Sequence, residues 1–206
     1  MKILRARFVM FLGLLITFAL AFGSVGLGGC QSYDVLIQKD QVTQQKWADL
    51  DAQLQRRADL VPNLVATVKA SAKHEEDTLA KVTQARADAT SVKISAEDLE
   101  DPDKMAAFQK AQENLHGALS RLLVTQEAYP DLKANGAFHD LQIQLEGTEN
   151  RILRAREEYN AAVAEFNTEL GKVRGQVINK ATGKPFKPRQ YFNASADAQA
   201  VPKVSF

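Results

Sequence analysis

Apolar residues recur at alternating three- and four-residue steps through most of the chain after residue 33. Such steps keep one face of a helix apolar and are typical of the seam between packed helices. A helix over 136–174 would be roughly 58 Å long, which indicates an elongated bundle. Its apolar stripe consists of Phe138, Leu141, Leu145, Thr148, Ile152, Ala155, Tyr159, Ala162, Phe166, Leu170 and Val173.

The first two predicted helices cover residues 33–58 and 60–89. Pro62 lacks a backbone N–H, so it breaks a helix interior but is tolerated in a first turn. We therefore predict a boundary here, with Asp59 as the N-cap of the second helix. A single kinked helix that runs through Pro62 is the main alternative. Asp40 falls on the otherwise apolar stripe of the first helix.

The third predicted helix covers residues 102–128, after a polar connection over 90–101. Asp101 followed by Pro102 is typical of an N-cap with proline at the first helical position. Pro130 ends the helix, because the residue before a proline is pushed out of the α region.

These patterns predict an all-α fold, an elongated antiparallel bundle of long coiled-coil-like helices over residues 31–174. The helical periodicity is lost over 175–206, which we predict to be an irregular tail that is flexible or docks in pieces. Ala, Leu, Gln, Glu, Lys and Arg dominate after residue 30, and all of them favour helix. Aromatic residues make up 7% of the chain, too few for a typical β-sandwich or β-barrel core.

The first 30 residues have the pattern of a signal sequence. Lys2, Arg5 and Arg7 precede an uncharged apolar stretch over residues 8–29. The cations remain on the cytoplasmic side, so the chain beyond this stretch is expected to be translocated. A stretch of 22 residues is also long enough to span a bilayer as an uncleaved anchor.

Cys30 is the only cysteine, which excludes an intramolecular disulfide. The run Leu27-Gly28-Gly29-Cys30 resembles a bacterial lipobox, in which the cysteine is acylated and becomes the new N-terminus. Several acyl chains, palmitate among them, would make a stable anchor. Residues 1–30 are therefore predicted to be a lipoprotein signal peptide or a transmembrane anchor. By resemblance to lipoprotein sorting, Gln31 favours the outer membrane.

Charge and motifs argue against several functional classes. Lys and Arg number 26 against 25 Asp and Glu, so a nucleic-acid partner is not expected. The sequence has no Gly-rich phosphate loop, nucleophile elbow or Cys/His pair. The three histidines, His74, His116 and His139, lie in different segments. We expect no metal, no cofactor, no catalytic residues and no enzymatic activity.

Two polar clusters lie at or beside the apolar stripes. If the helices pack, Arg57 or Arg56 would meet Glu149, and Asp59 would meet Arg156. Buried polar contacts of this kind fix helix register; a polar pocket for a ligand or partner is the alternative. The candidate interhelix residues are Arg56, Arg57, Asp59 and Asn63 in the first cluster, and Glu149, Asn150, Arg156 and Tyr159 in the second.

Three blocks of the sequence together resemble the LemA family of bacterial membrane-anchored proteins. They are QRRADLVPNLV at 55–65, YPDLKAN at 129–135, and the series from Leu141 to Asn160, and the ending PKVSF is also similar. The resemblance implies an N-terminal membrane anchor and an extracytoplasmic domain of long antiparallel helices. It implies no established activity. Many relatives carry a plain transmembrane anchor, so Cys30 is a departure from the pattern.

The leading functional hypothesis is a non-enzymatic, membrane-anchored scaffold or adaptor that faces the periplasm. Exposed parts of the helical seams would recruit unidentified envelope proteins or a second copy of the chain. The alternative is a receptor that binds a small ligand or peptide in a groove between helices.

Overall fold

The computed structural model describes the backbone of residues 2–71, 76–125, 129–181 and 185–193. Side chains are described from Tyr33 onward, except for a few at segment ends and in 173–181. The predicted signal or anchor segment and Cys30 therefore lie outside the described side chains, and their role remains a prediction. Within the part of the chain that was searched, no helix is both long enough and apolar enough to cross a membrane.

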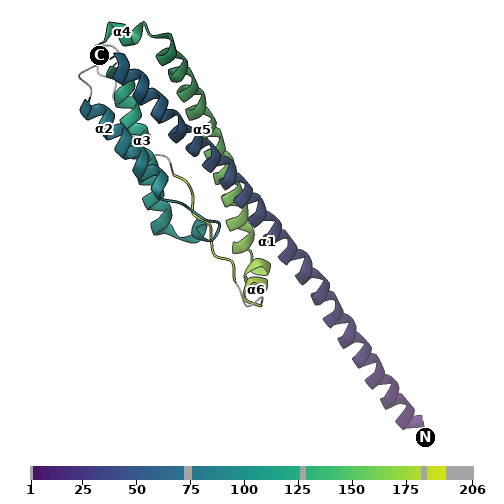
Figure 1. The fold of residues 1–206 in the computed structure, drawn as a ribbon. Coiled ribbons are helices and arrows are strands. Elements are labelled where there is room, and N and C mark those ends of the chain that lie inside the picture. The colour runs from purple at the N-terminus through teal and green to yellow at the C-terminus, as the bar shows by residue number, and fades with distance from the viewer. Residues whose placement is uncertain (1, 72–75, 126–128, 182–184, 194–206) are drawn as a thin grey trace, which may run out of the picture.

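The predicted all-α architecture is confirmed, and the described helices form an elongated rod (Figure 1). The four long helices are α1 (Lys2–Ser71), α2 (Glu76–Ser91), α3 (Pro102–Thr125) and α5 (Gly136–Gly171). Three short elements complete the order: the 3-10 helix η1 (Glu97–Glu100), α4 (Pro130–Lys133) and α6 (Val173–Ala181).

Helix α1 runs without interruption through Pro62, so the predicted boundary at Asp59 was wrong and the single-helix alternative holds. Pro62 has no N–H to donate to the carbonyl of Ala58, four residues earlier. The Nε of Arg86 in α2 donates to that carbonyl instead, at 2.8 Å. A side chain from a neighbouring helix thus satisfies the acceptor that the proline leaves unpaired. Asp59 lies inside α1 and is exposed.

Side-chain caps define the starts of α3 and α5. An Oδ of Asp101 accepts hydrogen bonds from the backbone N–H groups of Asp103 and Lys104, as expected of an N-cap. Asn135 caps α5 in the same way. Helix α5 ends at Gly171, where Lys172 takes an extended conformation with φ −64° and ψ 148°. Helix α6 follows at once and extends into the segment that was predicted to be irregular.

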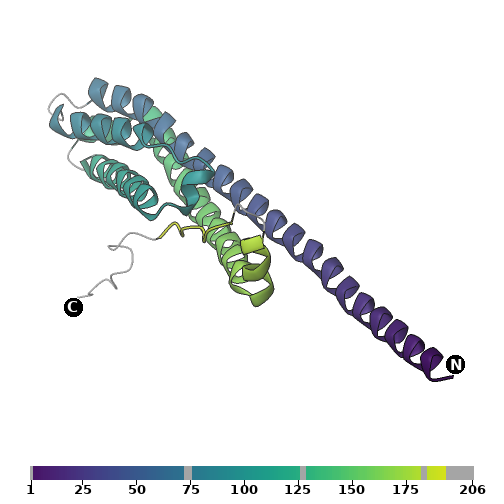
Figure 2. The same cartoon turned by 90° about the horizontal axis from the view of Figure 1, so that it is seen from below.

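Helix α1 is the centre of the rod. Helix α5 runs antiparallel along it, and the α2–α3 hairpin covers another side, as the two views show (Figures 1 and 2). Helix α3 packs mainly on α2. Among the described residues, α3 and α5 do not pack extensively on each other.

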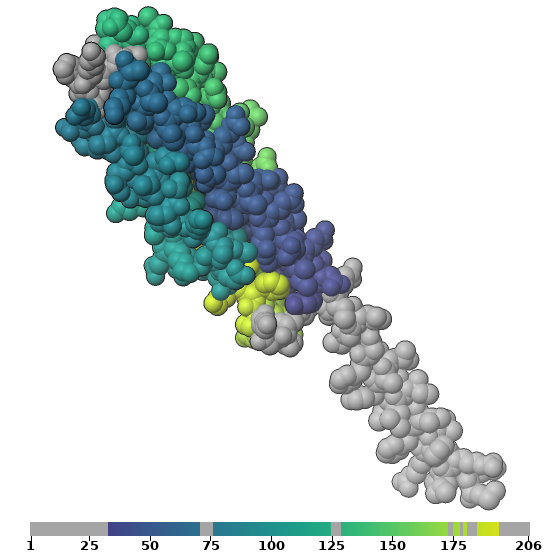
Figure 3. Space-filling model, in the orientation of Figure 1, coloured from purple at the N-terminus to yellow at the C-terminus, as the bar shows by residue number. Residues whose placement is uncertain are grey.

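The core is divided along the rod. Figure 3 shows one face of the rod, where side chains of α1, α2 and α3 form a continuous surface. A mainly aliphatic cluster, which also includes Phe138, joins α1, α2, α3 and α5 near the α4 end. An aromatic cluster follows toward the middle, built around Trp47, Phe108, Tyr159 and Phe192. A small third cluster contains Leu36, Phe166 and Leu170.

Candidate functional site

Residues 185–193, which we call the strap, have no regular secondary structure and lie along α5. Two asparagine side chains of α5 hold the strap backbone. The amide of Asn160 donates to the carbonyl of Phe192 and accepts from its N–H, both at 2.9 Å. Asn167 makes the same pair with Arg189, also at 2.9 Å. Each amide thus satisfies both polar groups of one strap residue.

The spacing of these pairs matches the geometry of the two segments. Asn160 and Asn167 are seven residues apart on a helix, about 10.5 Å at 1.5 Å per residue. Arg189 and Phe192 are three residues apart in an extended chain, about 10 Å at 3.3 Å per residue. The strap therefore stays in register with one face of α5 as it runs toward the N-terminal end of that helix.

A buried ion pair fastens the strap to α1. The Nε of Arg189 lies 2.9 Å from Oδ1 of Asp40, and its Nη2 lies 2.8 Å away from the same atom. Arg189 Nη1 also donates to the carbonyl of Ala96 at 3.2 Å, and Gln44 donates to the other carboxylate oxygen at 2.7 Å. The two charged side chains are only 8% and 7% exposed. Asp40 on the apolar stripe of α1 is thus explained by a cation from the other end of the sequence.

Tyr159 connects the strap to the aromatic cluster. Its hydroxyl donates to the carbonyl of Gln190 at 2.8 Å, and its ring contacts Trp47 edge-on, with 5.2 Å between centroids. Burial raises the pKa of Tyr159 well above its usual range, although the nearby Arg189 charge opposes the shift. On the opposite side, Gln109 of α3 donates to the carbonyl of Tyr191 at 2.8 Å. The strap consequently fills the space between α5 and α3 in this half of the rod.

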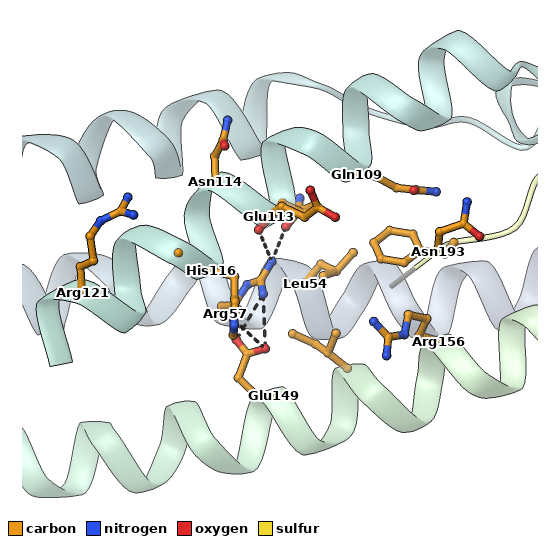
Figure 4. A pocket seen from close by; sticks show the side chains of 14 residues that line it. Leu54, Arg57, Gln109, Glu113, Asn114, His116, Arg121, Glu149, Arg156 and Asn193 are labelled. Carbon is orange, nitrogen blue, oxygen red and sulfur yellow. Dashed lines mark hydrogen bonds and ion pairs between the residues drawn. The ribbon is translucent and has the colours of Figure 1, made fainter. Parts of the chain in front are cut away.

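A second buried arginine lies farther along α1, beyond the end of the strap. Arg57 Nη1 lies 3.2 Å from Oε1 of Glu149 on α5. Its Nη2 donates to the backbone carbonyl of Gln112 on α3 at 3.2 Å and to the side-chain oxygen of Gln112 at 2.8 Å. Arg57 therefore bridges three helices (Figure 4). Its buried Nε has no hydrogen-bond partner among the described residues.

The carboxylate of Glu149 has two basic side chains beside it, Arg57 and His116. Burial opposes its ionisation, but a hydrogen bond from His116 and the charge of Arg57 together outweigh burial, so the pKa of Glu149 lies below its usual value. The Nδ1 of His116 on α3 lies 3.5 Å from Oε2 of Glu149. The side chain of Glu149 is 32% exposed, so it remains in contact with solvent.

A groove of about 620 Å³ opens between α3 and α5 over this cluster. Figure 4 shows Asn193 at one end of the groove and Arg121 at the other, with Arg57 and Glu149 between them. No ion pair among the described residues includes Arg121 or Arg156, which both line it. The floor contains Leu54 and Ile152. The groove thus combines an apolar floor with a polar rim that carries both charges, Arg121 and Arg156 on one hand and Glu113 on the other.

The other predicted site residues lie apart from this cluster. Arg56, Asp59, Asn63 and Asn150 are exposed on the helix surfaces. The Asp59 carboxylate accepts from Gln55 on its own helix at 2.8 Å, and its expected ion pair with Arg156 is absent from the described part of the chain. Tyr159 is fully buried and belongs to the strap contacts.

Sequence reasoning missed Arg189, Asn167 and Gln112. Asp40 was the available signal, because a carboxylate on an apolar stripe requires a buried cation or hydrogen-bond donors. Nothing in the sequence of 175–206, which has no helical periodicity, indicated which of its residues would supply that cation. The described residues include no group of three His, Cys, Asp or Glu side chains placed to hold a metal ion.

Comparison with known proteins gives a family and distant relatives. The model of the LemA family matches residues 46–206. Magnetosome proteins MamQ 1 and MamQ 2 of Paramagnetospirillum magneticum are each 26% identical over 176 residues, which is 78% of this chain and 64% of theirs. The chain thus spans about 64% of the length of these relatives. Magnetosome protein MamQ of Magnetospirillum gryphiswaldense is 33% identical over 76 residues, 37% of this chain and 27% of that protein.

Proposed function

The chain belongs to the LemA family, and we propose that it is a non-enzymatic protein of the bacterial envelope that serves as a membrane-anchored helical scaffold or adaptor. The observation that carries the proposal is the continuity of α1 from Lys2 to Ser71. The predicted anchor and the central helix of the bundle are one element with no linker. Arg57 lies 27 residues beyond Cys30, about 40 Å along a helix. The rod would hold its groove at a set distance from the membrane.

The buried polar groups support a structural role. Arg57, Asp40 and Arg189 each contact more than one element of the fold, and these contacts fix how the helices and the strap lie against one another. Such contacts favour one register over its neighbours. This is the arrangement expected of a rigid support whose surface, rather than a reaction centre, carries the function.

The names of the relatives add one point. They are magnetosome proteins, and we take from this only that a related helical domain can be part of a larger cellular structure. For this chain we propose envelope proteins or a second copy as partners, and no nucleic acid. We also propose a location on the periplasmic side of a membrane.

Two forms of the anchor remain as proposals. Cleavage before Cys30 with acylation of its thiol would leave a lipoprotein, consistent with the outer membrane, whereas retention would leave a membrane-spanning helix. Mass spectrometry of the mature N-terminus separates the two. We expect the mature protein to begin at an acylated Cys30. The Cys30→Ser variant should carry no acyl chain. An intact residue 1–30 segment in the mature protein would exclude the lipoprotein form.

In-cell cross-linking tests the scaffold role. A photoreactive residue at Asn114, beside the groove, is expected to capture envelope proteins that a matched residue at Asp88, on the exposed surface of α2, does not capture. Light scattering on the purified full chain would report self-association. A strict monomer without captured envelope proteins from either position would contradict the proposal.

A receptor for a small ligand or peptide is the second candidate, favoured by the groove of about 620 Å³ between α3 and α5. Ligand sites are concave and combine apolar walls with a few polar groups. Native mass spectrometry of the purified chain would detect a retained molecule. If the groove is the binding site, the purified Gly117→Phe variant, whose larger side chain fills the groove, should no longer retain the molecule.

A further inference from the structure

The strap ends where the groove begins. Phe192 and Asn193, its last residues, line one end of the groove, and the strap runs toward the opposite end, where Arg121 lies (Figure 4). Thirteen residues, 194–206, follow in the sequence. We propose that residues 194–206 continue along the groove between α3 and α5, and that Asp197 pairs with Arg121. The proposal does not depend on the anchor or on the scaffold role.

Lengths along the two segments agree with this path. The carbonyl of Tyr191 accepts from Gln109, which sets the strap level with that residue of α3. Arg121 is twelve residues farther along the helix, about 18 Å. Asp197 is six residues beyond Tyr191, about 20 Å in an extended chain. An extended continuation of the strap therefore brings the carboxylate of Asp197 level with Arg121.

The groove has room for a backbone at its midpoint. Gly117 lies inside α3, where glycine is the poorest helix former except for proline. A Cβ at Gly117 would meet only the flexible end of Arg121, at 3.8 Å, so packing among the described residues does not require glycine there. Close approach of another chain segment would account for the glycine. The same 3.8 Å distance shows that the guanidinium of Arg121 reaches back along the groove.

The sequence of the segment suits this environment. Alanine alternates with polar residues in ASADAQA over 194–200, so an extended chain would present small side chains on one face and Ser195, Asp197 and Gln199 on the other. Arg121 and Arg156 have no ion-pair partner among the described residues, and the carboxylate of Asp197 would supply the opposite charge. The LemA family model extends to residue 206, so the segment belongs to the matched domain.

Disulfide trapping in the detergent-solubilised full chain tests the path. Gly117→Cys and Ala196→Cys are combined, and diamide oxidises the two thiols. The control replaces Gly117→Cys by Ala87→Cys, an exposed position on α2 outside the groove. Docking raises the effective concentration of the two thiols, and we expect at least about tenfold faster intramolecular cross-linking with Gly117→Cys. Peptide mass spectrometry identifies the joined residues and distinguishes products that involve Cys30.

Charge exchange tests the pairing. Asp197→Arg should slow trapping at Gly117→Cys severalfold, and adding Arg121→Glu should restore the rate. Equal trapping at Gly117→Cys and Ala87→Cys would overturn the docking. Disulfide-linked dimers whose yield rises with protein concentration would show that the occupant is the tail of a second copy, which also overturns it. Failure of Arg121→Glu to restore the rate would refute the Asp197–Arg121 pair.

Discussion

The two halves of the rod each contain an ion pair with a buried arginine, but the two pairs differ in their exposure to solvent. In both, a buried arginine meets a carboxylate on another segment of the fold. In the strap-covered half, Arg189 and Asp40 are 8% and 7% exposed. In the groove half, Arg57 is 4% exposed, but its partner Glu149 is 32% exposed. The more buried pair is the one whose arginine belongs to the strap, which packs on α1 and α5 at that point.

The largest expected effect comes from breaking the pair in the strap-covered half. Arg189→Met leaves the Asp40 carboxylate buried without its cation, and removing one partner of a buried pair costs about 3–5 kcal/mol. Chemical denaturation of the full chain measures this loss. Arg57→Met should cost less, about 2 kcal/mol, because Glu149 can be solvated once its partner is removed.

A double variant separates the ion pair from the strap as a whole. Asp40→Leu combined with Arg189→Met removes both charges, and replacing a buried pair with apolar residues is often neutral. We expect the double variant to recover most of the stability lost in Arg189→Met. If Arg57→Met proves more destabilising than Arg189→Met, the distinction between the two halves fails.

The hydroxyl of Tyr159 offers a smaller test in the strap-covered half. Tyr159→Phe removes its hydrogen bond to the Gln190 carbonyl and keeps the ring in the aromatic cluster. The free energy of unfolding should fall by about 1 kcal/mol, the typical net value of one hydrogen bond. Tyr191→Phe is the matched control, since that side chain is 42% exposed. Equal effects of the two changes would mean that the strap contact contributes no measurable stability.

Periodicity in the sequence was sufficient for most of the fold and insufficient at Pro62, in α6 and over the strap. The ranges of α3 and α5 follow from apolar stripes and from caps such as Asp101, which are local signals. The continuity of α1 through Pro62 does not follow from local signals. The hydrogen-bond donor to the Ala58 carbonyl comes from Arg86 on another helix. Only the assembled bundle reveals that compensation.

The two ion pairs also differ in whether they could be predicted from the sequence. Arg57 and Glu149 lie on neighbouring stripes of two long helices, so facing stripes were enough to suggest that they would meet. Arg189 lies in a segment without periodicity, and its position depends on side chains of α5 such as Asn167. A strap held by tertiary contacts leaves no local pattern from which its course can be read.

Substitutions at two glycines test whether another segment packs on Gly117 in the groove. Gly147→Ala on α5 introduces a Cβ that meets only the flexible guanidinium of Arg151, and Gly147 does not line the groove. Higher helix propensity should stabilise this variant by about 0.5–1 kcal/mol. Gly117→Ala should gain less, because its Cβ would meet residues of the docked tail. Denaturation of both variants decides, and equal gains would indicate that nothing packs on Gly117.

The smallest expected effect is a pH dependence specific to the groove half. The pKa of Glu149 lies below its usual 4.5 in the folded protein, because His116 and Arg57 stabilise the ionised carboxylate more than burial destabilises it. The ionised form therefore favours the fold. Its contribution is complete above pH 4.5 and is lost as the pH falls through the lowered pKa. The exposure of Glu149 lets water screen the interaction, so the effect should be small.

Glu149→Gln should remove this dependence, so that the free energy of unfolding falls less steeply below pH 4.5 than in the unmodified protein. Urea denaturation at a series of pH values measures the slope. Asp98→Asn provides a control with a different window, since hydrogen bonds from Lys104 and Ser95 lower the pKa of Asp98 to about 2. Its effect should extend to lower pH. If the Glu149→Gln curve follows that of the unmodified protein, the carboxylate in the open groove is held no more favourably than in the unfolded chain.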